Sequence, residues 1–128
     1  MTSKPRKMTM ARAVRMADKA FSDYIRARDL KCVTCGKPTQ DCSHVFRRGH
    51  HAVRWNEWNA YGQCRACHFR HHYQSESWLL DYARRRVGQE QLESLRTEWG
   101  GMSHWKVYQV EEVARFYAQK AKALRNGK

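Results

Sequence analysis

The sequence is poor in acidic residues. It has 12 Asp and Glu against 25 Lys and Arg in 128 residues, which gives a formal net charge of +13. Such an excess of positive charge indicates a polyanionic partner, and nucleic acid is the commonest one. Charge alone leaves two alternatives open, which are contact with an anionic membrane and a basic surface that is merely solvated.

Long apolar segments are also missing. No run can cross a membrane, and the basic start, MTSKPRKMTM, lacks the apolar segment of a signal peptide. We therefore expect no membrane partner and a cytoplasmic location, where thiols stay reduced. There is no internal repeat and no low-complexity run, so we predict a flexible basic tail over residues 1–8 and a single domain over residues 9–128.

The apolar spacing predicts mainly helices. One helix is expected over residues 9–29, from apolar residues at Met10, Val14, Ala17, Phe21 and Ile25. Others are expected from Cys64 onward and over residues 76–86, 89–98 and 108–125. The last helix carries an apolar stripe, which predicts core packing, at Val110, Val113, Tyr117, Ala121 and Leu124.

Two short mixed segments, residues 40–48 and 51–55, predict a β-hairpin closed at Arg48-Gly49. With the helices, this hairpin predicts an α+β fold that is mostly helical. Its small core would hold the hairpin and a zinc knuckle, and the N- and C-terminal helices would flank it.

Four of the five cysteines form two C-x2-C pairs, which are Cys32 with Cys35 and Cys64 with Cys67. This spacing lets both sulfurs of a pair bind one tetrahedral metal. A single pair could be redox-active, but two pairs, one in a turn and one at a helix start, predict a closed structural Zn²⁺ site. A closed site has no position for a substrate, so this zinc would hold the fold. Cys42 is predicted to be a small packed residue.

Six of the seven histidines lie within residues 42–72. His68 and His72 are four residues apart, so they share a helix face and could bind a second metal. A histidine-rich basic helix that touches phosphates explains these two residues about equally well. The wider order of His44, Asn59, His68 and His72 favours the metal.

That order resembles the HNH, or ββα-metal, nuclease motif, which is often held in a treble-clef zinc frame with CxxC pairs placed as here. The resemblance implies that His44 is the catalytic base and that Asn59 bonds the hairpin backbone and orients it. It also implies that His68 and His72 bind a catalytic Mg²⁺ or Mn²⁺. HNH enzymes usually have Asp or His just before the base, but this chain has Ser43, so Asp41 is the candidate for the carboxylate ligand.

A closer resemblance is to the NinG (Rap) recombination proteins of lambdoid phages. It rests on CVTCGK, D-C-S-H, RRGHHAVRWNEWN, QCRAC and the trailing helices, from Phe21 to about Leu124. It implies a metal-dependent DNA endonuclease that cuts branched recombination intermediates such as Holliday junctions. Such a protein would be phage or prophage encoded and would act in the bacterial cytoplasm. NinG-like sequences tend to carry Asn where this chain has His68.

Three arginines around the motif are candidates for binding phosphates near the cleaved bond. These are Arg47, Arg48 and Arg54. A solvated arginine face is the alternative. His50 and His51 could contact DNA or the metal. Because a four-way junction has twofold symmetry, we expect a homodimer, with its contact on the C-terminal helices and the Val110–Leu124 stripe.

Two other functions fit parts of the pattern. A general HNH nicking or restriction-type nuclease would use the same residues on plain duplex DNA. A non-catalytic zinc-dependent nucleic-acid-binding module would explain the charge and the cysteines but not the order from His44 to His72.

Overall fold

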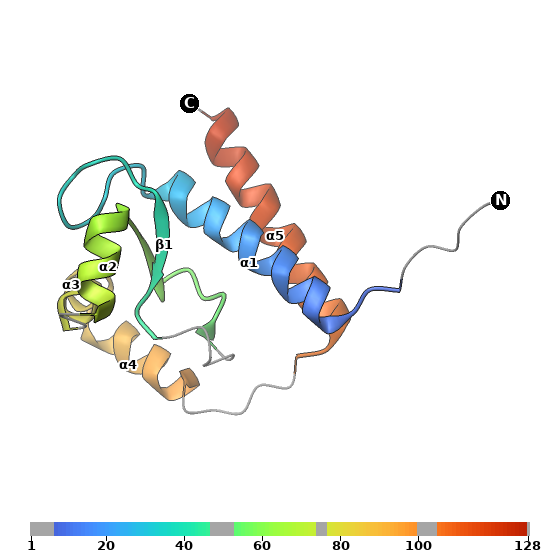
Figure 1. Ribbon diagram of the computed structural model, residues 1–128. Helices are drawn as coiled ribbons and strands as arrows, with labels where there is room; N and C mark the ends of the chain where they lie inside the picture. The colour runs from blue at the N-terminus through green and yellow to red at the C-terminus, as the bar shows by residue number, and fades with distance from the viewer. Residues whose placement is uncertain (1–6, 47–52, 74–76, 100–104, 128) are drawn as a thin grey trace.

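The computed structural model describes residues 7–46, 53–73, 77–99 and 105–127. Its elements follow in the order α1 (Met10–Arg28), β1 (Asp41–His44), β2 (Ala60–Gln63), α2 (Arg65–Tyr73), α3 (Ser77–Val87), α4 (Gln89–Trp99) and α5 (Val107–Asn126). The fold is therefore α+β and mostly helical, with a hairpin and a four-cysteine cluster flanked by long terminal helices, as predicted (Figure 1). No helix in the described part of the chain is long and apolar enough to span a membrane.

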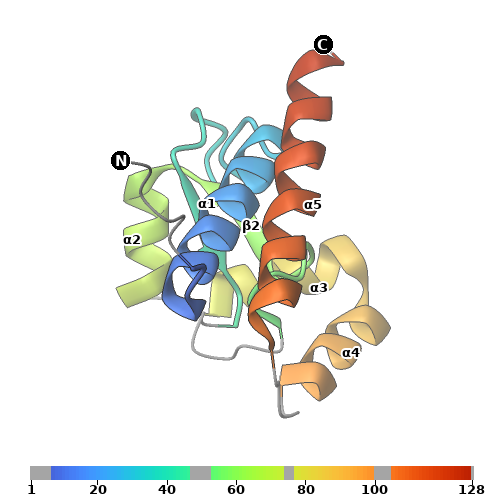
Figure 2. The ribbon, with the colours of Figure 1, turned by 90° about the vertical axis from the view of Figure 1, so that its right-hand side faces the viewer.

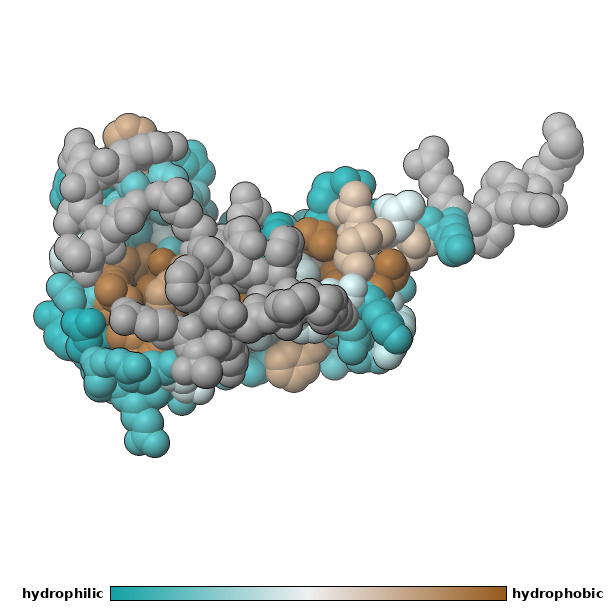
Figure 3. Space-filling view, turned by 90° about the horizontal axis from the view of Figure 1, so that it is seen from below, coloured by the Kyte–Doolittle hydropathy of each residue, from teal (hydrophilic) through white to brown (hydrophobic). Residues whose placement is uncertain are grey.

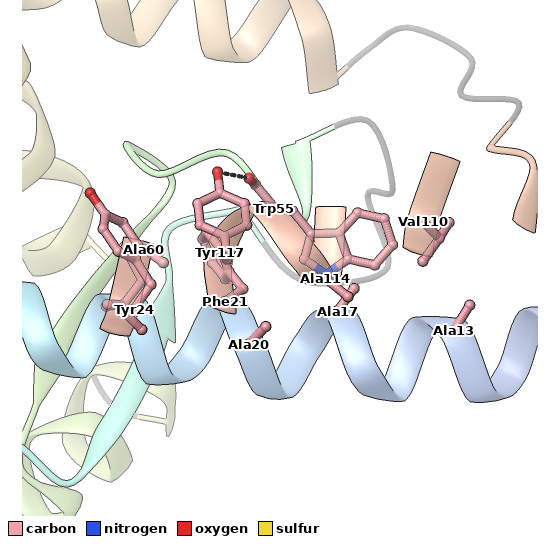
Figure 4. Close-up of a cluster of buried hydrophobic side chains, with 12 residues drawn as sticks. Ala13, Ala17, Ala20, Phe21, Tyr24, Trp55, Ala60, Val110, Ala114 and Tyr117 are labelled. Carbon is pink, nitrogen blue, oxygen red and sulfur yellow. Dashed lines mark hydrogen bonds between the residues drawn. The ribbon is translucent and has the colours of Figure 1, made fainter. Parts of the chain in front are cut away.

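The two longest helices, α1 and α5, lie side by side in both ribbon views (Figure 2). Ala13, Ala17 and Ala20 of α1 are buried, and their small side chains let α5 approach closely (Figure 4). The rings of Phe21 and Tyr117 meet edge to face with centroids 4.9 Å apart. These contacts form the first apolar core.

The apolar stripe of α5 belongs to this core. Val110, Tyr117 and Ala121 are buried, and Val113 and Leu124 pack against them, as predicted. Tyr117 also donates a hydrogen bond of 2.5 Å to the carbonyl oxygen of Trp55 (Figure 4). The stripe packs on α1 of the same chain, and the dimer contact expected on the C-terminal helices and this stripe stays a prediction. The homodimer itself stays a prediction.

The hairpin differs from its prediction. β1 pairs antiparallel with β2, in the register Asp41↔Gln63, Cys42↔Gly62, Ser43↔Tyr61 and His44↔Ala60. The predicted partner, residues 51–55, is wrong: within it, Val53 and Trp55 are buried outside any strand. Arg48-Gly49 lies outside the described residues. Every residue of β2 is buried, so β2 has no alternation of polar and apolar residues to reveal it.

A close approach holds β2 against the end of α1. The backbone N–H of Gly62 donates to the carboxylate of Asp29 at 2.9 Å. A Cβ at position 62 would lie only 2.8 Å from the Asp29 Cβ, so glycine is needed there. Arg28 pairs with the same buried carboxylate and donates to the carbonyl of Ala60, which fixes the strand further.

The second apolar core lies between β2 and the helices α3 and α4. Its buried members are Val53, Tyr61, Leu79, Ala83, Leu92 and Leu95. Gly88, at φ +88°, separates the two helices where the sequence predicts a break. Seen from below, apolar side chains reach the surface in two separate places, at the α2–α4 end and at the N-terminal end (Figure 3).

Candidate functional site

The four paired cysteines converge. The knuckle of Cys32 and Cys35 turns at Gly36, at φ +79°, and Cys64 and Cys67 stand at the start of α2. Their four Sγ atoms lie within 4.8 Å of one another, and the Sγ atoms of Cys35 and Cys64 are 3.6 Å apart. Tetrahedral thiolates on zinc are separated by about 3.8 Å. The cluster is therefore consistent with structural zinc.

The ionisation of these thiols also favours a cation. Burial raises the pKa of Cys32, but backbone N–H groups that donate to its sulfur outweigh burial and lower that pKa to about 6. Burial, the hydrogen bonds that the Cys67 thiol donates to the neighbouring sulfurs and the charge on Cys32 raise the pKa of Cys67 to about 12. Ionisation of one thiol thus makes ionisation of the next less favourable, so four thiolates together need a cation among them.

The candidate base and the candidate ligands of the catalytic metal line one cleft, which is separate from the four-cysteine cluster. The cleft has a volume of about 830 Å³ and lies between α1, β1 and α2. Asp41 and His44 come from β1, and His68 and His72 come from α2. The opposite wall is the C-terminal half of α1, which contributes Asp18, Ser22 and Arg26.

His44 ends β1 and is half-buried. Its Nε2 lies 3.0 Å from the carbonyl oxygen of Arg54, and its ring packs 5.6 Å from the ring of Phe21. A carbonyl oxygen can only accept, so Nε2 of His44 carries the proton. In the neutral ring the lone pair is then on Nδ1, the atom that can accept a proton.

Asn59 is completely buried and ties together the segments that flank residues 47–52. Its side-chain amide donates to the carbonyl oxygens of Phe46 at 3.1 Å and Val53 at 3.0 Å. Its side-chain oxygen accepts the N–H of Phe46 at 2.8 Å. The predicted hydrogen bonds to the hairpin backbone, close to His44, are present. Their part in catalysis stays a prediction.

Asp41, His68 and His72 are close but do not form a complete metal site. Oδ2 of Asp41 lies 3.1 Å from Nδ1 of His68, and the rings of His68 and His72 are 6.2 Å apart. Partial burial raises the pKa of Asp41, but hydrogen bonds from His68 and Arg65 outweigh it and lower that pKa below its ordinary value. In the described part of the chain, only the four cysteines bring three or more potential ligands together.

Arg54 is bound within the protein. Its guanidinium donates to both carboxylate oxygens of Asp18, at 2.9 and 2.5 Å, and its side chain is 13% exposed. The same carboxylate accepts the indole N–H of Trp55 at 2.9 Å. This pairing favours a positioning role over phosphate contact, which stays a prediction for Arg54. The other predicted contacts, Arg47, Arg48, His50 and His51, lie outside the described residues.

Two acidic residues that the sequence did not single out tie distant segments together. Asp18 anchors the segment that presents the Arg54 carbonyl to His44. Glu57 accepts hydrogen bonds from Tyr24 of α1 and Lys120 of α5, both at 3.0 Å. Each bond joins residues far apart in the sequence, so no local pattern could have revealed either residue.

Comparison with known proteins gives one family. The family described as the bacteriophage lambda NinG protein matches residues 3–127. The proteins named ninG of Escherichia phage lambda and Escherichia phage 933W are each 29% identical to this chain, in alignments 128 positions long that cover 90% of the chain. The chain spans 58% and 59% of the lengths of these two relatives. No solved structure matches the chain.

Proposed function

The chain belongs to the bacteriophage lambda NinG family, and from this premise we propose that it is a metal-dependent endonuclease acting on branched DNA. Its substrates would be recombination intermediates such as Holliday junctions, cut by phosphodiester hydrolysis. The main support is that Asp41, His44, His68 and His72 line one cleft. Zn²⁺ on the four cysteines would hold the start of α2 against the knuckle and so position one wall of that cleft.

His44 is the proposed general base. With its Nε2 proton donated to the Arg54 carbonyl, Nδ1 can accept a proton from the water that attacks phosphorus. Asn59 orients this group by fixing the backbone at Phe46. Both supporting contacts are made by uncharged groups, and the neutral imidazole is the form that can act as a base.

The helix histidines are the proposed ligands of the catalytic Mg²⁺ or Mn²⁺. Such a cation would stabilise the charge on the reacting phosphate and the departing oxygen. The geometry favours a supporting role for Asp41: it accepts the Nδ1 proton of His68, which leaves the lone pair of the His68 ring on Nε2, where it can bind a metal. His72, which is exposed on the same face, would complete the pair.

Phosphates would be held mainly by α1. Successive spacings of three and four residues place a polar stripe on one face of this helix, at Arg12, Arg15, Lys19, Ser22 and Arg26. The stripe enters the cleft at Ser22 and Arg26. Lys19 and Arg26 both pair with Asp23, and exposed pairs of this kind are weak enough for phosphate to replace.

One observation favours a second candidate, a non-catalytic zinc-dependent DNA-binding module. The possible ligand atoms of Asp41, His68 and His72 do not converge within the described residues, so a second metal would have to draw them together. The general HNH nuclease shares the proposed catalytic residues and differs only in acting on plain duplex.

A cleavage assay separates these functions. Wild type and His44→Ala would be tested with Mg²⁺ or Mn²⁺ on a four-way junction and on linear duplex of matched sequence. We expect the wild type to cut the junction faster, and His44→Ala to bind it normally but cut it at least about 100-fold more slowly. Equal cutting of both DNAs would favour the general nuclease. Binding without metal-dependent cutting would favour the binding module.

A further inference from the structure

Phe69 is an apolar side chain on a strongly basic helix. It is 59% exposed, whereas α2, with the sequence RACHFRHHY, has two arginines, three histidines and no acidic residue. A single exposed apolar side chain is ordinary on a protein surface. What makes Phe69 informative is therefore its position.

Phe69 lies on the reactive face of α2. The spacing of Arg65, His68, Phe69 and His72 places all four on one side of the helix, and all four line the cleft. Cys67 and His71 are the buried residues of the helix, and His71 lies at the inner edge of the same cleft. An aromatic ring therefore stands beside the two proposed metal ligands, in the wall that a nucleotide would face.

We propose that Phe69 stacks on a nucleobase beside the cut phosphate and thereby selects DNA in which a base is unpaired or unstacked. The inference rests on the proposed function, since it names what the same cleft prefers as substrate. Base stacking on an aromatic side chain needs an accessible base face, which paired and stacked duplex covers and a branch point exposes.

Charge favours DNA as the occupant. Arg65 and Arg70 flank Phe69 on α2, both exposed, and Arg26 lies in the opposite wall. Exposed arginines around an exposed aromatic ring suit a phosphate backbone with a splayed base, which is the usual arrangement in proteins that bind single strands.

The first test compares Phe69→Ala with wild type on the four-way junction and on matched linear duplex. We expect kcat/KM on the junction to fall about 10- to 100-fold, as losing one stacked base predicts, and kcat/KM on duplex to stay unchanged. Phe69→Trp should restore the preference. The control is Phe116→Ala, because Phe116 is 53% exposed on α5 but does not line the cleft; its preference should match wild type.

The second test does not require cutting. A 5-iododeoxyuridine placed next to the branch point would be photo-crosslinked with Ca²⁺ present, and the crosslinked peptide identified by mass spectrometry. The crosslink should map to Phe69, disappear in Phe69→Ala and persist in Phe116→Ala. This crosslinking test separates the stacking proposal from the endonuclease proposal. A crosslink to Phe69 in a protein that cuts no DNA would support stacking and contradict the endonuclease function.

Two results would overturn the inference. In one, Phe69→Ala keeps both the junction preference and the crosslink. In the other, its activity falls equally on both DNAs along with its melting temperature, which would make Phe69 a structural residue.

Discussion

At the scale of single residues, uncharged groups hold the proposed base in place. A backbone carbonyl fixes the proton on the His44 ring, and the carboxamide of Asn59 fixes the backbone just beyond it. The carbonyl of Arg54 and the carboxamide of Asn59 are themselves held in position, because Asp18 binds the side chain of Arg54 and the Asn59 side chain is fully buried. The position of the imidazole therefore depends on hydrogen-bond direction more than on charge.

Replacing Asn59 by Asp tests that dependence. The carboxylate could still accept the N–H of Phe46 but could not donate to the carbonyl oxygens of Phe46 and Val53. A buried charge would then face two acceptors, so we expect a loss of at least about 2 kcal/mol in the free energy of unfolding, with loss of cleavage. Urea unfolding measures the first effect.

Asn56→Asp is the matched control for that substitution. The side-chain oxygen of Asn56 accepts the N–H of Trp58 at 2.9 Å, a bond that a carboxylate makes equally well. We expect near wild-type stability from this variant. If the two aspartate variants unfold at the same urea concentration, the donor role of Asn59 is not what fixes the segment.

At the scale of secondary-structure elements, local signals were sufficient for the helices and insufficient for the hairpin. Helical spacing depends on residues three and four apart, so the bounds of α1, α3, α4 and α5 agree with prediction to within two residues. The second strand depends on burial from both sides, which is a tertiary property. Short mixed composition is the basis for both predicted strands. It holds for β1, but at residues 51–55 the two cores bury Val53 and Trp55 outside any strand.

The four cysteines were predictable because their ligand spacing is itself a local signal, and they link two elements. We expect one tightly held Zn²⁺ per chain, and we expect Cys35→Ser to lose it and to unfold or aggregate, since structural zinc contributes directly to folding. Elemental analysis with thermal melting measures both effects. Cys42→Ser is the control, because Cys42 packs against the first apolar core and does not join the cluster. A folded wild type without zinc would contradict the assignment.

At the scale of the whole molecule, the described residues form two apolar cores, and each buries at least one tyrosine. Tyr61 of β2 lies in the second core and Tyr117 of α5 in the first. Burial raises the pKa of Tyr61 to about 12 and also raises the pKa of Tyr117 above its ordinary value. The two hydroxyls differ in one respect. Tyr117 donates to Trp55, while the described residues offer the buried hydroxyl of Tyr61 no hydrogen-bond partner.

High pH should therefore weaken both cores. A tyrosine whose pKa is raised by folding contributes stability that is fully present below about pH 10, the pKa of tyrosine in the unfolded chain. This stability is lost as the pH rises through the higher pKa of the tyrosine in the folded protein. With the pKa of Tyr61 at about 12, this loss should reach about 1 kcal/mol at pH 11, and Tyr61→Phe should abolish it.

At pH 7, Tyr61→Phe should be neutral or stabilising, whereas Tyr117→Phe should cost about 1 kcal/mol for its lost hydrogen bond. Urea unfolding of the three proteins at pH 7 and pH 11 measures these differences. A Tyr61→Phe variant that loses as much stability as wild type between the two pH values would show that ionisation of Tyr61 does not limit the fold.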